Sequence, residues 1–134
     1  MPITFRVLDK HRILLATFSG VINDEQVIRF WTEFYESDLW KPEYDEISDL
    51  REASVEAVTM EGVSKLASIA GQYTANINVV HRTAIIAPED LTFGLSRFYE
   101  AISSQTPEVI MVFRDPASAV EWLGRDETLL TEIG

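Results

Sequence analysis

The stretch Glu108–Gly124, EVIMVFRDPASAVEWLG, encodes a strand followed at once by a helix. Residues 108–113 are almost all apolar and β-branched or aromatic, which predicts a buried strand. Asp115 suits the N-cap of the helix, Pro116 its first turn, and Gly124 the position just after its end. A strand joined to a helix by a short turn is the building unit of α/β folds.

The same unit recurs earlier in the chain. The predicted strands are 3–8, 13–18, 44–50, 82–87 and 108–113. The predicted helices are 23–37, 58–72, 90–102 and 116–123. A four-residue turn, 9–12, joins the first two strands as an antiparallel hairpin, and the later strands alternate with helices. We therefore predict an α/β fold with a five-stranded, mostly parallel sheet, an antiparallel first strand and about four helices. One domain covers 1–134, and 125–134 form a C-terminal tail.

The composition narrows the class of protein. The chain has 134 residues, of which 46% are hydrophobic and 25% charged, as in a soluble globular domain. No apolar run is long enough to span a bilayer, and the N-terminus lacks a signal pattern, so we expect a cytoplasmic protein without stable membrane insertion. The net charge of -11 argues against nucleic acid as a partner. The absence of cysteine excludes disulfides and thiolate chemistry.

Motifs for catalysis or metal binding are weak. The two histidines, His11 and His81, are 70 positions apart, and we interpret both as exposed residues of a turn and a strand start. Neither is expected near Ser54 or Ser96, and no G-x-S-x-G motif occurs. We predict no catalytic residue, no cofactor and no metal. A small enzyme that uses Asp49 or Glu89 as a base is an alternative.

The carboxyl ends of parallel strands are where ligands gather in open sheets. Phe93 and Arg97 are one helical turn apart near that edge, where a ring and a guanidinium could hold a carboxylate, a phosphate or a partner's backbone. Alternatively, Phe93 packs under a loop and Arg97 pairs with Glu89 or Glu100. Ser54 is expected in the turn between a strand and a helix. The predicted ligand- or partner-binding residues are Asp49, Arg51, Ser54, Glu89, Phe93 and Arg97.

Two segments resemble the SpoIIAA-like family, which groups with STAS domains and, by fold, with CRAL-TRIO lipid-binding domains. They are T-A-I-I-A-P-E-D-L-T-F-G-L-S-R-F-Y-E at 83–100 and V-F-R-D-P-A-S-A-V-E-W-L at 112–123. The resemblance covers 3–124 and implies a right-handed β-α superhelix with strands in sequential order. It also implies a non-enzymatic, regulatory module that binds a protein or a small anionic or apolar ligand. Carriage of a lipid-like ligand, by fold analogy, is an alternative.

Ser54 invites comparison with the phosphorylated serine of STAS domains, which lies in a D-L-S-x-x-D-S-S/T-G motif. Here Asp49-Leu50 matches the start of that motif, but Arg51 replaces its first serine. Ser54 is displaced by one position from the phosphorylated serine, and no glycine follows. Glu52 and Glu56 would repel a phosphate on Ser54, so the sequence argues against phosphorylation.

Several predicted strands are apolar on both faces, although crossovers of one hand place helices on one face only. These strands are 13–18, 82–87 and 109–113. The second face could be covered by the C-terminal tail, by a ligand or by another subunit. The tail supplies Leu129, Leu130 and Ile133. We predict a homodimer.

Overall fold

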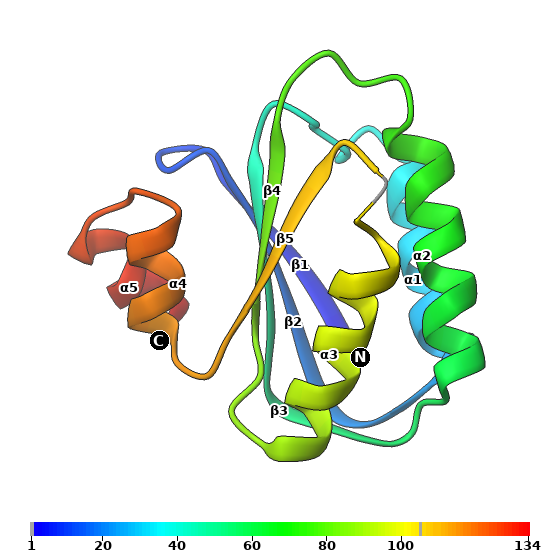
Figure 1. The fold of residues 1–134 in the computed structure, drawn as a ribbon. Coiled ribbons are helices and arrows are strands. Elements are labelled where there is room, and N and C mark those ends of the chain that lie inside the picture. The colour runs from blue at the N-terminus through cyan, green and yellow to red at the C-terminus, as the bar shows by residue number, and fades with distance from the viewer. Residues whose placement is uncertain (1, 105) are drawn as a thin grey trace.

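The computed structural model describes residues 2–104 and 106–134. Its strands are β1 (Ile3–Leu8), β2 (Ile13–Asn23), β3 (Asp45–Ala57), β4 (His81–Ile86) and β5 (Glu108–Phe113). Its helices are α1 (Asp24–Tyr35), α2 (Met60–Thr74), α3 (Asp90–Ile102), α4 (Pro116–Trp122) and α5 (Glu127–Ile133). The sheet has the order β1-β2-β3-β4-β5, with β1 antiparallel and the other neighbours parallel (Figure 1). The predicted fold is confirmed. None of the described helices is both long and apolar enough to cross a bilayer.

Helices α1, α2 and α3 cover one face of the sheet (Figure 1). Helix α1 begins with a capping box, in which the Asn23 side chain accepts from the Gln26 amide and the Gln26 side chain accepts from the Asn23 amide. Its buried stripe includes Val27, Trp31 and Phe34, which pack with the apolar side chains of β1 and β2. The helical spacing of these apolar residues thus gives α1 one apolar face, which packs against the sheet.

Helices α4 and α5 cover part of the other face (Figure 1). Asp115 caps α4 as predicted, and Gly124 follows it with a φ of 71°. The tail forms a fifth helix, and its Leu129 is fully buried with the β2–β4 residues Leu15, Ile47 and Ile86. Because the tail covers these apolar strands, the homodimer is no longer needed to bury them.

Strands β2 and β3 are longer than predicted. The strand 13–18 was expected to end at Ser19, but β2 continues to Asn23 and pairs with β3 as far as Ala57. The register shifts after Thr17, and Gly20 adopts a φ of 71°. Such an irregularity bends a strand without ending it. Ser54 therefore lies inside the sheet rather than in a turn, which corrects its predicted position.

Helix α3 occupies 90–102, as predicted, and its N-cap is Glu89. It faces the sheet with Leu95 and Tyr99, which pack against the apolar core, and with Thr92 and Ser96, which are buried and line a cavity beneath the helix. The apolar residues at its two ends, Leu91 and Ile102, are exposed.

Candidate functional site

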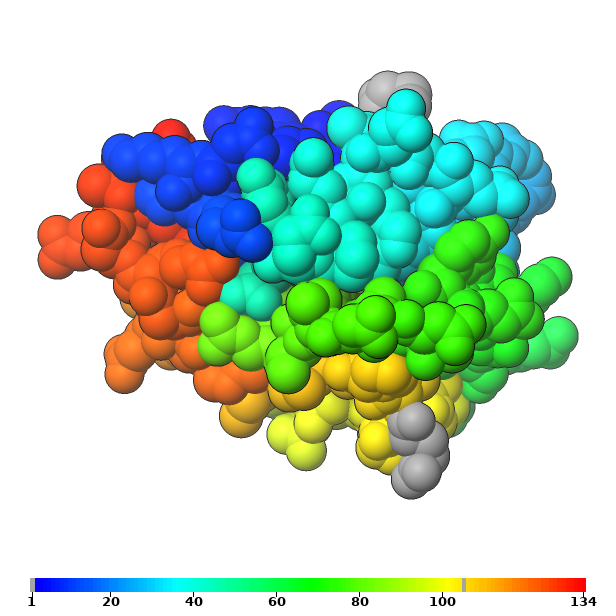
Figure 2. Space-filling view, turned by 90° about the horizontal axis from the view of Figure 1, so that it is seen from above, coloured from blue at the N-terminus to red at the C-terminus, as the bar shows by residue number. Residues whose placement is uncertain are grey.

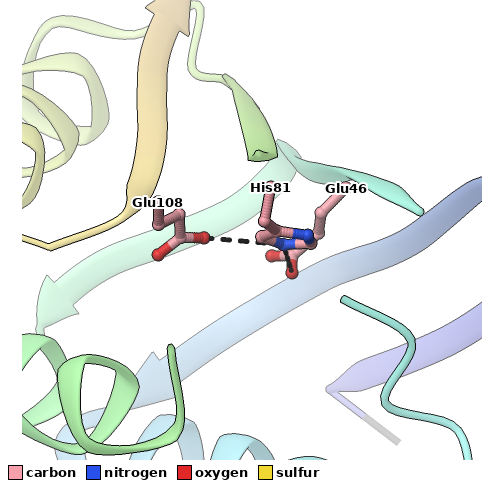
Figure 3. Close-up of side chains that lie close together, drawn as sticks. All are labelled: Glu46, His81 and Glu108. Carbon is pink, nitrogen blue, oxygen red and sulfur yellow. Dashed lines mark hydrogen bonds and ion pairs between the residues drawn. The ribbon is translucent and has the colours of Figure 1, made fainter. Parts of the chain in front are cut away.

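Three ionisable residues stand together at the amino ends of three neighbouring strands (Figure 3). Glu46, His81 and Glu108 lie at or near the first residues of β3, β4 and β5. His81 is opposite Glu108 in the register, and Glu46 is opposite Thr83. Side chains two residues apart on a strand share a face, so all three project toward α1–α3. We call this cluster the triad.

The triad is buried. The exposed fractions of the side chains of Glu46, His81 and Glu108 are 5%, 0% and 4%. The loops 36–44 and 75–80 lie side by side over this end of the molecule (Figures 1 and 2). The ring of Trp40, from the first of these loops, meets the His81 ring edge-on at 5.0 Å between centroids. The charged groups are thus held out of bulk water.

The contacts of His81 fix the roles of its two nitrogens. Nδ1 lies 3.2 Å from the carbonyl oxygen of Pro42, which can only accept a hydrogen bond, so Nδ1 carries a proton. Nε2 lies 3.4 Å from Glu46 Oε1 and 3.7 Å from Glu108 Oε2. A neutral imidazole with its proton on Nδ1 would direct the lone pair of Nε2 at two carboxylates, which repel it. The two carboxylates therefore favour protonation of Nε2, which makes the His81 ring positively charged.

Hydroxyl groups support both carboxylates. Ser48 Oγ donates to Glu46 Oε2 at 3.4 Å. The Thr83 hydroxyl donates to Glu108 Oε2. Both hydroxyl residues lie two positions along a strand from a triad position, Ser48 after Glu46 and Thr83 after His81, so the same alternation brings them to this face.

Burial and charge displace the pKa values of Glu108 and His81. Burial raises the pKa of Glu108, the charge of Glu46 raises it further, and the result is about 7 despite the opposing effects of His81 and Thr83. Burial lowers the pKa of His81, but the hydrogen bond and charge of Glu46 and the charge of Glu108 outweigh it and raise this pKa to about 9. Burial raises the pKa of the Tyr35 and Tyr99 hydroxyls, and the two glutamates raise it further. The triad is therefore a source of negative potential.

A cavity of about 110 Å³ lies between the sheet and α1–α3. Glu46 and Glu108 form part of its wall, and most of the remaining lining is apolar. Its other polar lining residues are Ser48, Thr83, Thr92 and Ser96. A cavity of about 150 Å³ can hold benzene, whereas pockets for drug-sized or lipid-sized ligands begin near about 300 Å³. This cavity is suited to a compact apolar group with one polar end.

Two of the residues predicted from the sequence form a pair that holds the C-terminus. Arg51 donates to both carboxylate oxygens of Asp49, at 2.9 Å from Nε and 2.7 Å from Nη2. The hydrogen bond and charge of Asp49 raise the pKa of Arg51 against the effect of burial. Arg51 also donates to the carbonyl oxygen of Gly134 at 2.9 Å. The pair joins β3 to the end of α5.

The other predicted residues lie apart from that pair. Phe93 is covered by the guanidinium of Arg114, 4.1 Å from the ring centroid, and Arg97 Nε lies 3.6 Å from Glu100 Oε1. Glu89 is exposed before α3, and Ser54 is paired with Val21 in the sheet. Ser54 thus lies well before the N-terminus of α2, which could otherwise stabilise a phosphate. The six residues predicted to bind a ligand or partner therefore take part in separate local contacts rather than in one site.

The triad itself was missed from the sequence. His81 was interpreted as an exposed strand-start residue, but it is fully buried, because the loops before β3 and β4 close over it. A ligand site was predicted at the carboxyl ends of the strands, whereas Glu46 and Glu108 lie at the amino ends. The signal in the sequence is an ionisable residue within two positions of the start of each of three consecutive predicted strands.

No protein family model and no curated protein matches the chain. Among solved structures, it is similar to an uncharacterized protein from the DUF3478 family of Shewanella loihica PV-4. The similarity covers 90% of this chain and 91% of that chain, with 20% identity and a TM-score of 0.54, and that protein is described as having a SpoIIAA-like fold. This chain has a SpoIIAA-like fold. The resemblance predicted from 83–100 and 112–123 is thereby confirmed for the fold, which is as far as 20% identity reaches.

Proposed function

We propose that this protein is a non-enzymatic, cytoplasmic SpoIIAA-like binding module whose cavity takes a small ligand. The observation that carries the proposal is the cavity between the sheet and α1–α3, which is apolar along most of its wall and has Glu46 and Glu108 among its lining residues. Apolar walls with a few convergent polar groups are the usual composition of a ligand pocket. The volume of about 110 Å³ favours a compact ligand over a lipid chain.

The polar residues of the cavity wall determine which chemical groups the ligand must carry. The carboxylates of Glu46 and Glu108 accept hydrogen bonds, and the net charge of the triad is negative when Glu108 is ionised. The hydroxyls of Ser48 and Thr83 are already engaged with Glu46 and Glu108. A ligand with an amine, alcohol or amide donor next to a small apolar group satisfies both parts of the cavity.

A regulatory module of this kind would also contact another protein chain. The outer strand β5 exposes Val109 and Met111, with exposed fractions of 45% and 44%. Exposed apolar side chains on an edge strand are suited to pairing with a second copy. We include a homodimer in the proposal, and light scattering at high micromolar concentration checks it. A monomer at that concentration contradicts it.

Native mass spectrometry of protein purified from its own host tests the ligand. We expect an added mass on the wild-type chain, and we expect Ser96→Leu, which fills the cavity, to lose it. Ser64→Leu is the matched control, because Ser64 is an exposed serine on α2. An added mass that persists in Ser96→Leu places the ligand elsewhere. A wild-type dimer with no added mass contradicts a cavity ligand and favours protein interaction alone.

A small enzyme is the second candidate, supported by one observation. Glu108 is a cavity carboxyl whose pKa, raised mainly by burial, is about 7, the range in which a general acid or base works best near neutral pH. This role was predicted for Asp49 or Glu89, but Asp49 is engaged by Arg51 and Glu89 is exposed. If the bound compound is turned over, Glu108→Gln should abolish turnover and retain binding.

A further inference from the structure

We propose that Glu46, His81 and Glu108 bind one divalent transition-metal ion of the Zn²⁺ type through one carboxylate oxygen from each glutamate and Nε2 of the histidine. The site lies at the amino ends of β3, β4 and β5 (Figure 3). It shares Glu46 and Glu108 with the wall of the cavity, and it goes beyond the small ligand proposed above.

The spacing of the three donor atoms suits such an ion. His81 Nε2 is 3.4 Å from Glu46 Oε1 and 3.7 Å from Glu108 Oε2, and the three donors all lie within 4.8 Å of one another. Zinc bonds to nitrogen and oxygen are about 2.0–2.2 Å long, so tetrahedral donors are about 3.4 Å apart. Octahedral neighbours at the same bond length would be only about 3.0 Å apart. The separations involving His81 fit the tetrahedral arrangement.

The surroundings of the donors are those of a metal site. Nδ1 of His81 faces the Pro42 carbonyl oxygen at 3.2 Å, which directs the lone pair of a neutral imidazole through Nε2. Thr83 donates to Glu108, and Ser48 donates to Glu46, so both carboxylates are oriented. Each proposed ligand therefore has a supporting hydrogen bond of its own.

The charges of the three triad residues favour a bound cation. Two ionised glutamates and a neutral histidine carry a charge of -2, which a divalent cation cancels. Without an ion, the buried glutamates have one histidine as their only ion-pair partner among the described residues. Buried charges of one sign are costly unless they are paired or coordinate a metal.

Three protein ligands leave one tetrahedral position open. Because Glu46 and Glu108 line the cavity, the open position faces it. This is the arrangement of zinc sites that bind water or an exogenous group, rather than of closed structural sites. Hard ions that prefer six or more oxygen ligands, such as Ca²⁺ and Mg²⁺, fit a histidine-containing set of three less well.

Titration of chelator-treated protein without a histidine tag tests the site, with Co²⁺ as a spectroscopic probe and Zn²⁺ as competitor. We expect one Co²⁺ per chain, the intense visible absorption of four-coordinate cobalt, and displacement of cobalt by Zn²⁺. His81→Gln and Glu108→Gln should each weaken binding by at least about 100-fold. Thr83→Val, which removes a supporting hydrogen bond, should weaken it by about 10–100-fold.

His11→Gln is the matched control, because His11 is the only other histidine and its Nε2 lies 3.4 Å from Glu132. We expect no change in cobalt binding for this variant. Loss of binding in His11→Gln, with binding retained in His81→Gln, would assign the ion to a site near His11 and Glu132 and overturn the proposal. Absence of four-coordinate cobalt from the folded wild-type protein would overturn it as well. The cavity ligand is tested separately by the Ser96→Leu experiment, because Ser96 lines the cavity and is not one of the proposed metal ligands.

Discussion

Two charged clusters, each containing a buried carboxylate, lie back to back across the sheet and differ in how their charges are balanced. Asp45 and Glu46 are consecutive in β3, and His81 and Arg82 are consecutive in β4. Strand alternation sends Glu46 and His81 toward α1–α3, and Asp45 and Arg82 toward α4–α5. The two clusters therefore arise from the same two dipeptides.

In the cluster on the α4–α5 face, one carboxylate is paired with two permanent cations. Asp45 Oδ2 accepts from Arg82 and from Arg125, each at 2.8 Å. The two arginines also donate to the carbonyl oxygen of Leu123, at 3.2 Å and 2.6 Å, where α4 ends. Cations at a helix C-terminus are stabilising, so this cluster fixes α4 to the sheet.

Among the described residues, the triad is paired with no arginine or lysine. Arginine stays charged at any ordinary pH, whereas the charge of His81 depends on a proton. The charges of the first cluster are therefore fixed, whereas those of the triad change with protonation. Perturbed pKa values next to a cavity are characteristic of functional sites.

The largest expected effect is the loss of the Asp45 carboxylate. Asp45→Asn leaves Arg82 and Arg125 without their shared partner and should lower the free energy of unfolding by about 3 kcal/mol. Urea denaturation at pH 7 measures this change. Asp38→Asn, at an exposed aspartate, is the control and should alter stability by less than about 0.5 kcal/mol. Equal stabilities of the two variants would refute the structural role of Asp45.

The pH dependence of stability in metal-free protein should follow the triad. The folded pKa values of Glu108, about 7, and His81, about 9, both exceed their ordinary values of 4.5 and 6.5. The folded state therefore binds more protons, and its stability falls as pH rises, through 4.5–7 for Glu108 and 6.5–9 for His81. We expect a total loss of at least about 2 kcal/mol between pH 5 and pH 9, measured by urea denaturation. Stability that rises over this range would contradict the assigned pKa shifts.

Glu108→Gln separates the two titrations. The amide cannot ionise, so the variant should be more stable than wild type at pH 8, by at least about 1 kcal/mol. The difference should grow from pH 5 to pH 7 and then stay level. Denaturation curves of both proteins at matched pH values measure it. A Glu108→Gln variant less stable than wild type at pH 8 would show that the ionised carboxylate is well paired.

The smallest effect is expected at the surface. Arg97 is 60% exposed at the side chain and its Nε lies 3.6 Å from Glu100 Oε1. Arg97→Ala should change the free energy of unfolding by less than about 0.5 kcal/mol, because exposed ion pairs contribute little. If the strand-end surface binds a partner, the same variant should weaken that binding without a large fall in melting temperature. A large loss of stability with unchanged binding would make Arg97 a structural residue.

Local signals in the sequence were sufficient for most of the elements. The capping box at Asn23, the N-cap at Asp115 and the apolar run 109–113 each specify their structure through neighbouring residues, and most predicted ends lie within two residues of those observed. The exceptions are β2 and β3, whose extensions stabilise each other across the register shift after Thr17. Strand pairing between segments that are distant in the sequence cannot be inferred from the local residue pattern of either segment.

The sequence by itself determined the order of strands and helices, and with it the SpoIIAA-like fold, because strand periodicity and helix caps are local properties. Only the tertiary structure decided which polar residues meet. Glu46, His81 and Glu108 come together through the registers of β3, β4 and β5 and through the loops that close over them. The raised pKa values of His81 and Glu108 follow from the burial and proximity of these charged groups, which a linear sequence does not contain.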